Sequence, residues 1–171
     1  MKLIFVRHGQ AGPYCADDAG RDLTEFGEAQ ARQTGEYLAN NHQIDLIIAS
    51  PYNRANQTAR LILQAITDKN AESESADMPA FITVSSITPD DDPTIGLDDI
   101  DCAIRNKFGD DANDKTIAVV CHMPIVARMT AILDGLPPAP FALAECRCFD
   151  APVIAPDLGV QRAAFVPAQP E

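Results

Sequence analysis

The chain has 171 residues, a length that predicts one domain over residues 1–171 with a core large enough to fold without disulfide or metal support. Its 25 Asp and Glu residues outnumber its 13 Lys and Arg residues, and the resulting net charge of −12 argues against a nucleic-acid partner or an anionic membrane surface. An acidic protein binds phosphate only where cations gather locally, so the positions of the few arginines are informative.

The sequence predicts neither export nor membrane insertion. The apolar run over residues 1–6 is too short for a secretory signal and has no cleavage site after it. No segment approaches the ~20 apolar residues of a membrane span. The five cysteines are odd in number and show no CxxC spacing, which favours free thiols in a reducing compartment, with Cys146 and Cys148 in the core. We therefore predict a cytoplasmic protein.

The first half of the chain predicts two buried strands, each followed by a helix. Residues 2–6 form a short apolar run typical of a buried strand. Residues 24–40 predict a helix with Thr24 as its N-cap and acidic residues in its first turn. Residues 44–49 predict the second strand. Ser50-Pro51 then predicts an N-cap followed by a proline at the first position of the next helix.

The second half continues this alternation after a polar, acidic loop over residues 69–80. The remaining predicted elements are, in order, a strand over 81–84, an Asp- and Pro-rich loop over 88–93, a helix over 95–107, a strand over 116–121, a helix beginning at Pro124, and strands over 145–149 and 160–166 at the sheet edges. Alternating strands and helices predict the α/β class: a three-layer sandwich with a mostly parallel central sheet flanked by helices.

Three polar clusters directly follow three of these strands: Arg7-His8-Gly9, residues 50–55 and His122-Met123-Pro124. Ligands of open α/β sheets bind beyond the carboxyl ends of the strands, so the three clusters are expected to converge on one pocket. This pocket would hold two arginines and two of the three histidines, beside two helix N-termini that attract anions. Arginine forks match phosphate oxygens, and the sequence therefore predicts a site for a tetrahedral dianion.

These clusters resemble the histidine phosphatase superfamily, whose fold is phosphoglycerate mutase-like. The resemblance covers most of the chain and runs, in order, through Leu3–Gly9, Leu23-Thr24-x-x-Gly27-x-x-Gln30-Ala31, Ser50-Pro51-x-x-Arg54-Ala55-x-Gln57-Thr58-Ala59 and His122-Met123-Pro124.

The resemblance implies a reaction in which the neutral imidazole of His8 takes up the phosphoryl group, with one ring nitrogen held by a backbone carbonyl. Arg7, Arg54 and His122 would bind the phosphoryl oxygens, and no metal or other cofactor would be needed. Arg21 would line the mouth of the pocket, although a plain surface charge explains it equally well. The other implied substrate-binding residues are Gly9, Gln10 and Ser50.

Within the superfamily, the chain resembles the small SixA-type phosphohistidine phosphatases. It is short, Ile87-Thr88-Pro89 resembles their Leu-Thr-Pro loop, and residues 122–126 resemble their His-Leu-Pro-Leu-Val. Gln10 departs from that branch, which commonly has Asp there. The resemblance implies a signal-transduction enzyme that dephosphorylates a histidine of a phosphotransfer or phosphocarrier protein.

Two alternatives stay open beside this hypothesis. One is a small-molecule phosphomonoesterase of the same superfamily, acting on a sugar or nucleotide-precursor phosphate. Such an enzyme needs a carboxylic acid to protonate its leaving group, and Asp90 is the candidate, with Asp91 and Asp92 beside it. A solvated acidic turn explains these aspartates as well. The other alternative is a regulatory module that binds phosphate without turnover. The sequence leaves the partner and the oligomeric state open.

Overall fold

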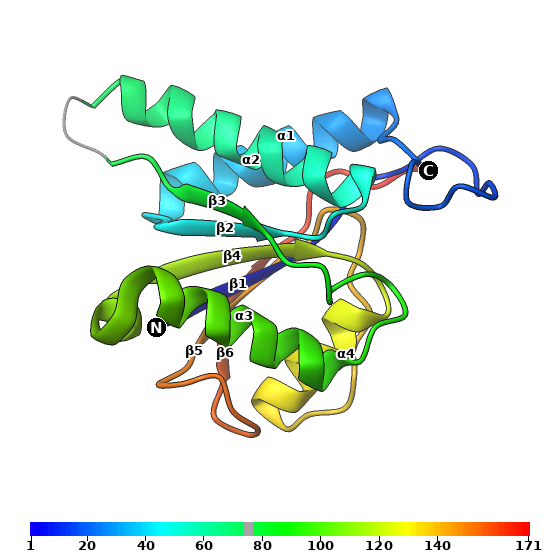
Figure 1. Ribbon diagram of the computed structural model, residues 1–171. Coiled ribbons are helices and arrows are strands. Elements are labelled where there is room, and N and C mark those ends of the chain that lie inside the picture. Colours follow the sequence, from blue (N-terminus) through cyan, green and yellow to red (C-terminus); the bar gives the residue numbers. More distant parts are fainter. Residues whose placement is uncertain (74–76) are drawn as a thin grey trace.

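The computed structural model describes residues 1–73 and 77–171, and over these ranges strands and helices alternate as the sequence predicts. Figure 1 shows α1 and α2 on one face of the sheet and α3 and α4 on the other, which confirms the α/β sandwich. In chain order the elements are β1 (Lys2–Arg7), α1 (Glu25–Asn41), β2 (Leu46–Ala49), α2 (Asn53–Ala71), β3 (Ala80–Thr83), α3 (Pro93–Phe108), the 3-10 helix η1 (Gly109–Asp114), β4 (Thr116–Cys121), α4 (Ile125–Asp134), β5 (Cys146–Asp150) and β6 (Val160–Phe165).

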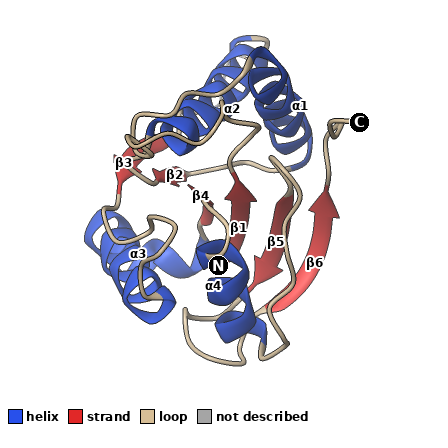
Figure 2. Ribbon diagram, turned by 90° about the vertical axis from the view of Figure 1, so that its right-hand side faces the viewer, coloured by secondary structure: helices blue, strands red, loops and turns tan. Residues whose placement is uncertain are grey.

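The six strands form one sheet in the order β3-β2-β4-β1-β5-β6. The first four strands in this order are mutually parallel, and β5 runs antiparallel to both of its neighbours. The prediction of a mostly parallel sheet is therefore confirmed, whereas β5 is an inner strand and only β6 lies at an edge. In the register, Arg7 of β1 lies opposite Cys121 of β4, and Ala49 of β2 opposite Val120. The residues that follow these three strands are consequently neighbours at one end of the sheet, the end that faces the viewer in Figure 2.

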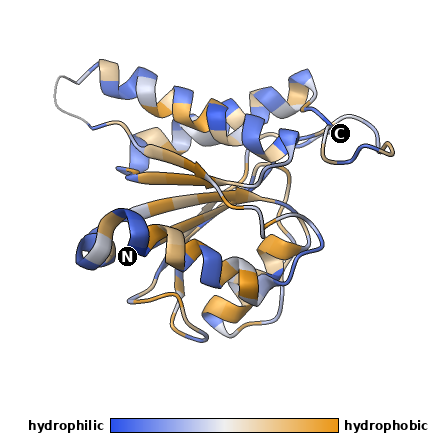
Figure 3. Ribbon diagram, viewed as in Figure 1, coloured by the Kyte–Doolittle hydropathy of each residue, from blue (hydrophilic) through white to orange (hydrophobic). Residues whose placement is uncertain are grey.

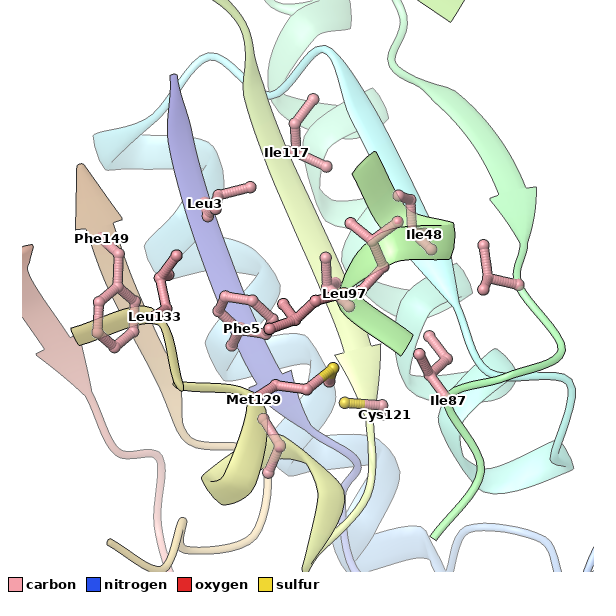
Figure 4. Close-up of a cluster of buried hydrophobic side chains, with 14 of the residues drawn as sticks. Leu3, Phe5, Ile48, Ile87, Leu97, Ile117, Cys121, Met129, Leu133 and Phe149 are labelled. Atoms are coloured by element: carbon pink, nitrogen blue, oxygen red, sulfur yellow. The ribbon is translucent and has the colours of Figure 1, made fainter. Parts of the chain in front are cut away.

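The central strands are buried on both faces. In β1, Leu3 and Phe5 pack in the cluster under α3 and α4, which Figure 4 shows in close-up, while Ile4 and Val6 pack in the cluster under α1 and α2. Figure 3 shows the strands as largely hydrophobic. A strand covered on both faces carries apolar residues at every position, and each such side chain contributes about 1.5–3 kcal/mol when fully buried. This is why the four inner residues of β1, Leu3 to Val6, form a continuous apolar run in the sequence.

The two cysteines that the sequence predicts in the core, Cys146 and Cys148, are buried. Both residues lie in β5 and belong to the cluster under α1 and α2.

Within the described part of the chain, none of the helices combines the length and the apolar character that crossing a bilayer requires.

The start of α1 ties the segment after β1 to the helix. Thr24 is the N-cap, as predicted, and its Oγ1 accepts a hydrogen bond from the N–H of Gly27 at 3.0 Å. A side chain at Gly27 would collide with the carbonyl of Gln10, so glycine is required for this close approach. The peptide that continues from His8 is thereby held against the first turn of α1.

The predicted start of the second helix is wrong by two residues. The helix α2 begins at Asn53 with Tyr52 as its N-cap, so Ser50 is not the cap and Pro51 is not in the first turn. The reason is competition for the Ser50 hydroxyl, which lies 2.7 Å from Nε2 of His122 and accepts a longer bond from the N–H of Tyr52. Further along, α2 runs to Ala71 and shortens the predicted loop over 69–80, of which residues 74–76 lie outside the described residues.

Candidate active site

The polar clusters after β1, β2 and β4 meet at the carboxyl ends of these strands. The backbone continues the ladder beyond each strand: His8 N–H donates to the Cys121 carbonyl, and Ser50 N–H donates to the Val120 carbonyl, each at 3.0 Å. The imidazole rings of His8 and His122 lie with their centroids 5.1 Å apart. Two histidines that are 114 positions apart in the sequence thus face one another, as the positions of the motifs predict.

The environment of His8 fixes its tautomer. Its Nδ1 lies 2.6 Å from the carbonyl oxygen of Gly9, which can only accept, and its Nε2 lies 3.2 Å from Nε of Arg54, which can only donate. The ring is therefore the Nδ1–H tautomer with its lone pair on Nε2. Burial lowers the pKa of His8 to about 3, with further lowering by Arg54, Arg7 and Arg21 against the opposing Gly9 hydrogen bond. A neutral imidazole with a free lone pair is the form that a nucleophile requires.

His122 is completely buried and also neutral. Burial lowers its pKa to about 2, and the nearby His8 and the arginines act in the same direction. Its Nε2 lies 2.7 Å from Oγ of Ser50, and the ring of Tyr52 packs edge-on at 5.3 Å between centroids. Its Nδ1 is buried and has no partner among the described residues. Ser50 thus contacts His122 and is itself fully buried.

Arg54, the second residue of α2, is buried with all three guanidinium nitrogens engaged. Its Nε donates to His8, Nη1 donates to the Asp18 carbonyl at 2.7 Å, and Nη2 lies 3.1 Å from Oδ2 of Asp18. The other carboxylate oxygen of Asp18 pairs with Nη1 of Arg21, also at 3.1 Å. Arg21 is thereby joined to the site. Sequence reasoning missed Asp18, which lies in an irregular segment where no motif marks it.

Arg7 is anchored from a different part of the chain. Its Nη1 donates to the Phe141 carbonyl at 2.7 Å, and burial lowers its pKa against the opposing charge of Glu145. The Nε atoms of Arg7 and Arg21 are buried without a partner among the described residues. Buried donors of this kind carry a free-energy penalty until an acceptor reaches them, and an oxyanion supplies several acceptors at once. We call Arg7, His8, Arg54 and His122 the His/Arg cluster.

Gly9 and Gln10 hold the segment that carries His8. Gly9 N–H donates to Oγ1 of Thr58 at 3.1 Å, and Gln10 N–H donates to Oε1 of Gln30 at 2.9 Å. The Gln10 side chain accepts from Oγ1 of Thr24 at 2.7 Å. These contacts bind the peptide after β1 to α1 and α2.

The structure does not connect the three loop aspartates to the cluster. Asp90 is exposed, Asp91 accepts hydrogen bonds from the N–H and the hydroxyl of Thr88, and Asp92 is the N-cap of α3. Among the described residues, no three His, Cys, Asp or Glu side chains lie grouped in a way that could hold a metal ion.

The lowered histidine pKa values predict a loss of stability in acid. In the unfolded chain these rings titrate near 6.5, so between pH 6.5 and about 3 the unfolded state binds protons that the folded state does not. Stability therefore falls as the pH falls through this window, and going from pH 7 to pH 5 is expected to lower the free energy of unfolding by about 2 kcal/mol per histidine. Urea unfolding of the parent and of His8→Gln tests this: the decrease should be about 2 kcal/mol smaller in the variant. An equal decrease in both proteins would contradict the assignment.

Comparison with known proteins finds phosphatases of similar sequence and fold. The model of the histidine phosphatase superfamily (branch 1) matches residues 3–75. A phosphohistidine phosphatase SixA homolog from Haemophilus influenzae is 28% identical over 141 residues, which are 79% of this chain and 78% of that protein. The structure of the protein histidine phosphatase SixA complexed with tungstate is similar with a TM-score of 0.74, at 22% identity over 98% of this chain and 97% of that one. A mycobacterial glucosyl-3-phosphoglycerate phosphatase shares the fold with a TM-score of 0.69, at 15% identity over 99% of both chains.

Proposed function

We propose that this chain is a phosphatase of the histidine phosphatase superfamily and that its substrate is a phosphorylated histidine on a protein. The observation that carries the proposal is the neutral His8, whose Nε2 lone pair is directed at the guanidinium of Arg54. The similarity to a SixA homolog over 79% of the chain supports the choice of phosphohistidine.

The proposed reaction has two steps. In the first, Nε2 of His8 attacks phosphorus, the bond between phosphorus and the substrate imidazole breaks, and the leaving imidazole takes up a proton from solvent water. In the second, water attacks the phosphorylated His8 and releases inorganic phosphate. Arg7, Arg54 and His122 bind the equatorial oxygens and stabilise the charge of a loose transition state. Apart from water, the scheme uses only side chains of the protein, and it includes no metal or cofactor.

Ser50 has a role in this scheme through His122. Its Oγ accepts the N–H of Tyr52, so its hydroxyl proton is free to point at Nε2 of His122. We propose that this bond leaves the proton of the neutral His122 ring on Nδ1, where it donates to a phosphoryl oxygen. Ser50 would then orient His122 rather than bind the substrate itself.

The identity of the leaving group favours phosphohistidine over an ester. An alkoxide leaving group needs a carboxylic acid, whereas imidazole leaves readily once protonated. The carboxyl group that contacts the cluster, Asp18, has its two oxygens paired with two guanidinium groups, and neither oxygen faces His8. Asp91 and Asp92 are hydrogen-bonded within their own loop. We further propose a cytoplasmic phosphotransfer or phosphocarrier protein as the partner, with no nucleic acid or membrane involved.

Side-by-side turnover of a phosphorylated histidine phosphotransfer domain and a panel of small phosphate esters, with EDTA present throughout, tests the substrate class. We expect kcat/KM to favour the phosphohistidine by ~100-fold, which corresponds to about 2.7 kcal/mol of transition-state discrimination. Faster hydrolysis of a sugar or nucleotide-precursor phosphate would instead support the phosphomonoesterase, and Asp90→Asn would then show whether this exposed carboxyl is its acid. Turnover of neither substrate class would contradict the proposed function.

A further inference from the structure

One carboxylate lies between two arginines at the site. Asp18 belongs to the irregular segment that follows β1, and its two carboxylate oxygens are divided between Arg21 and Arg54, at 3.1 Å each. Its backbone carbonyl adds a third contact, 2.7 Å from Nη1 of Arg54. The segment is in turn fixed to the start of α2, because Asn53 N–H donates to the carbonyl of Ala19 at 3.0 Å.

These contacts determine which edge of the Arg54 guanidinium remains for a ligand. Asp18 occupies the end edge, which consists of Nη1 and Nη2. The group is planar, so one N–H of the neighbouring Nη lies parallel to Nε–H along the side edge. Nε donates to Nε2 of His8, the atom to which phosphorus becomes bonded in the proposed mechanism. The side edge of Arg54 is thus directed toward the place where the phosphoryl oxygens lie.

We propose that Asp18 is a positioning residue, which clamps Arg54 by its end edge and Arg21 by Nη1 so that both guanidinium groups meet the phosphoryl group formed on His8. This inference rests on the proposed phosphatase mechanism and extends it to a residue outside the four motifs. Once phosphorylated, His8 can no longer accept from Arg54, and the side edge then donates to two equatorial oxygens. Fixed donors of this kind act in the transition state without a reorganisation cost.

A positioning role has a signature that distinguishes it from simple anion binding. Removing the carboxylate makes the site more positive by one unit charge, which favours phosphate binding, but it also frees the two guanidinium groups, which weakens transition-state stabilisation. For Asp18→Ala we therefore expect kcat to fall by about 30-fold, while the inhibition constant of inorganic phosphate stays within about twofold of the parent value or falls. Asp18→Asn keeps one acceptor oxygen, so we expect its kcat to fall by only about threefold, a third of the Asp18→Ala loss on a logarithmic scale.

The test measures kcat, KM, the inhibition constant of inorganic phosphate and Tm for the parent, the two Asp18 variants and Asp17→Asn. The last is the matched control: Asp17 lies in the same segment and accepts from Gly20 N–H at 3.1 Å, so its substitution removes the same charge without touching an arginine. Asp17→Asn should keep the parent kcat.

Two results would overturn the inference. One is an Asp18→Ala kcat within threefold of the parent. The other is a loss of phosphate affinity and of Tm in parallel with kcat, which indicates that Asp18 only holds the segment together. Both results are measured on a parent protein that turns over phosphohistidine or p-nitrophenyl phosphate. An inactive parent would instead contradict the proposed function, so the two failures are distinguishable.

Discussion

His8→Ala is expected to lower kcat by at least ~10⁴-fold on any substrate of the enzyme, because it removes the nitrogen that accepts the phosphoryl group in the proposed mechanism. Nδ1–H of His8 donates to the carbonyl of Gly9, so Nε2 is the ring nitrogen whose lone pair can form the bond to phosphorus in that mechanism. Water attacking the substrate directly would find the arginines in place but no covalent route. The residual activity of His8→Ala therefore measures what positioning and charge achieve without a nucleophile.

His42→Ala is the matched control for this variant. His42 is the C-cap residue of α1, and its ring packs against Tyr37, so its removal should leave kcat unchanged. Rapid quenching with radiolabelled substrate gives an independent readout. The parent should yield a protein phosphate that is labile in acid and stable in base, and His8→Ala should yield none. Retention of label on His8→Ala would show that another residue is the nucleophile.

Arg54→Ala is expected to lower kcat by about 10³-fold, since Nε of Arg54 donates to Nε2 of His8, the nitrogen that accepts the phosphoryl group in the proposed mechanism. Arg54→Lys keeps the charge but replaces the planar fork by a single ammonium group, and we expect it to recover no more than about tenfold of that loss. The pKa of His8 should rise in both variants when measured by NMR, although less in Arg54→Lys. The loss of the nearby guanidinium removes one of the causes that lower this pKa.

The matched control for Arg54 is Arg60→Ala on the same helix. Arg60 is exposed, with its Nε bonded to Asn56 and its guanidinium over the ring of Phe81. Its loss should change kcat by less than twofold. An Arg54→Lys variant with full activity would mean that charge alone, and not the geometry of the fork, is what the site requires.

The strands and the convergence of the motifs were predictable because they follow from local patterns. An apolar run such as residues 2–6 buries both of its faces when it is an inner strand of a sheet that is covered by helices on both sides. The residues after such a run must then emerge at the end of the sheet, where Arg7 and Cys121 lie opposite one another. Thr24 was predictable as an N-cap because its capping bond, from the N–H of Gly27, spans only three residues of the chain.

Tertiary contacts decided the features that the sequence did not predict. Ser50 looks like an N-cap, but its hydroxyl contacts His122, and α2 starts later. The helix predicted over 95–107 begins two residues earlier, at Pro93, because Asp92 caps it, and an N-cap residue before a proline is a signal that the sequence itself carries. Asp18 has no local signal, since its importance comes from two arginines that only the fold brings to it.

The residues of the site lie in parts of the fold whose amides are expected to differ strongly in their protection from hydrogen exchange. His8 and His122 continue β1 and β4, whose interior residues are fully buried, so their amides are expected to exchange with solvent only when the whole domain unfolds. The irregular segment with Asp18 carries only the isolated bridge between Ala11 and Leu23 and its contacts with α2 and Arg21, so we expect its amides to exchange through local opening. The two histidines of the proposed mechanism therefore stay in register through such local opening, whereas the same opening releases the clamp that Asp18 places on Arg54.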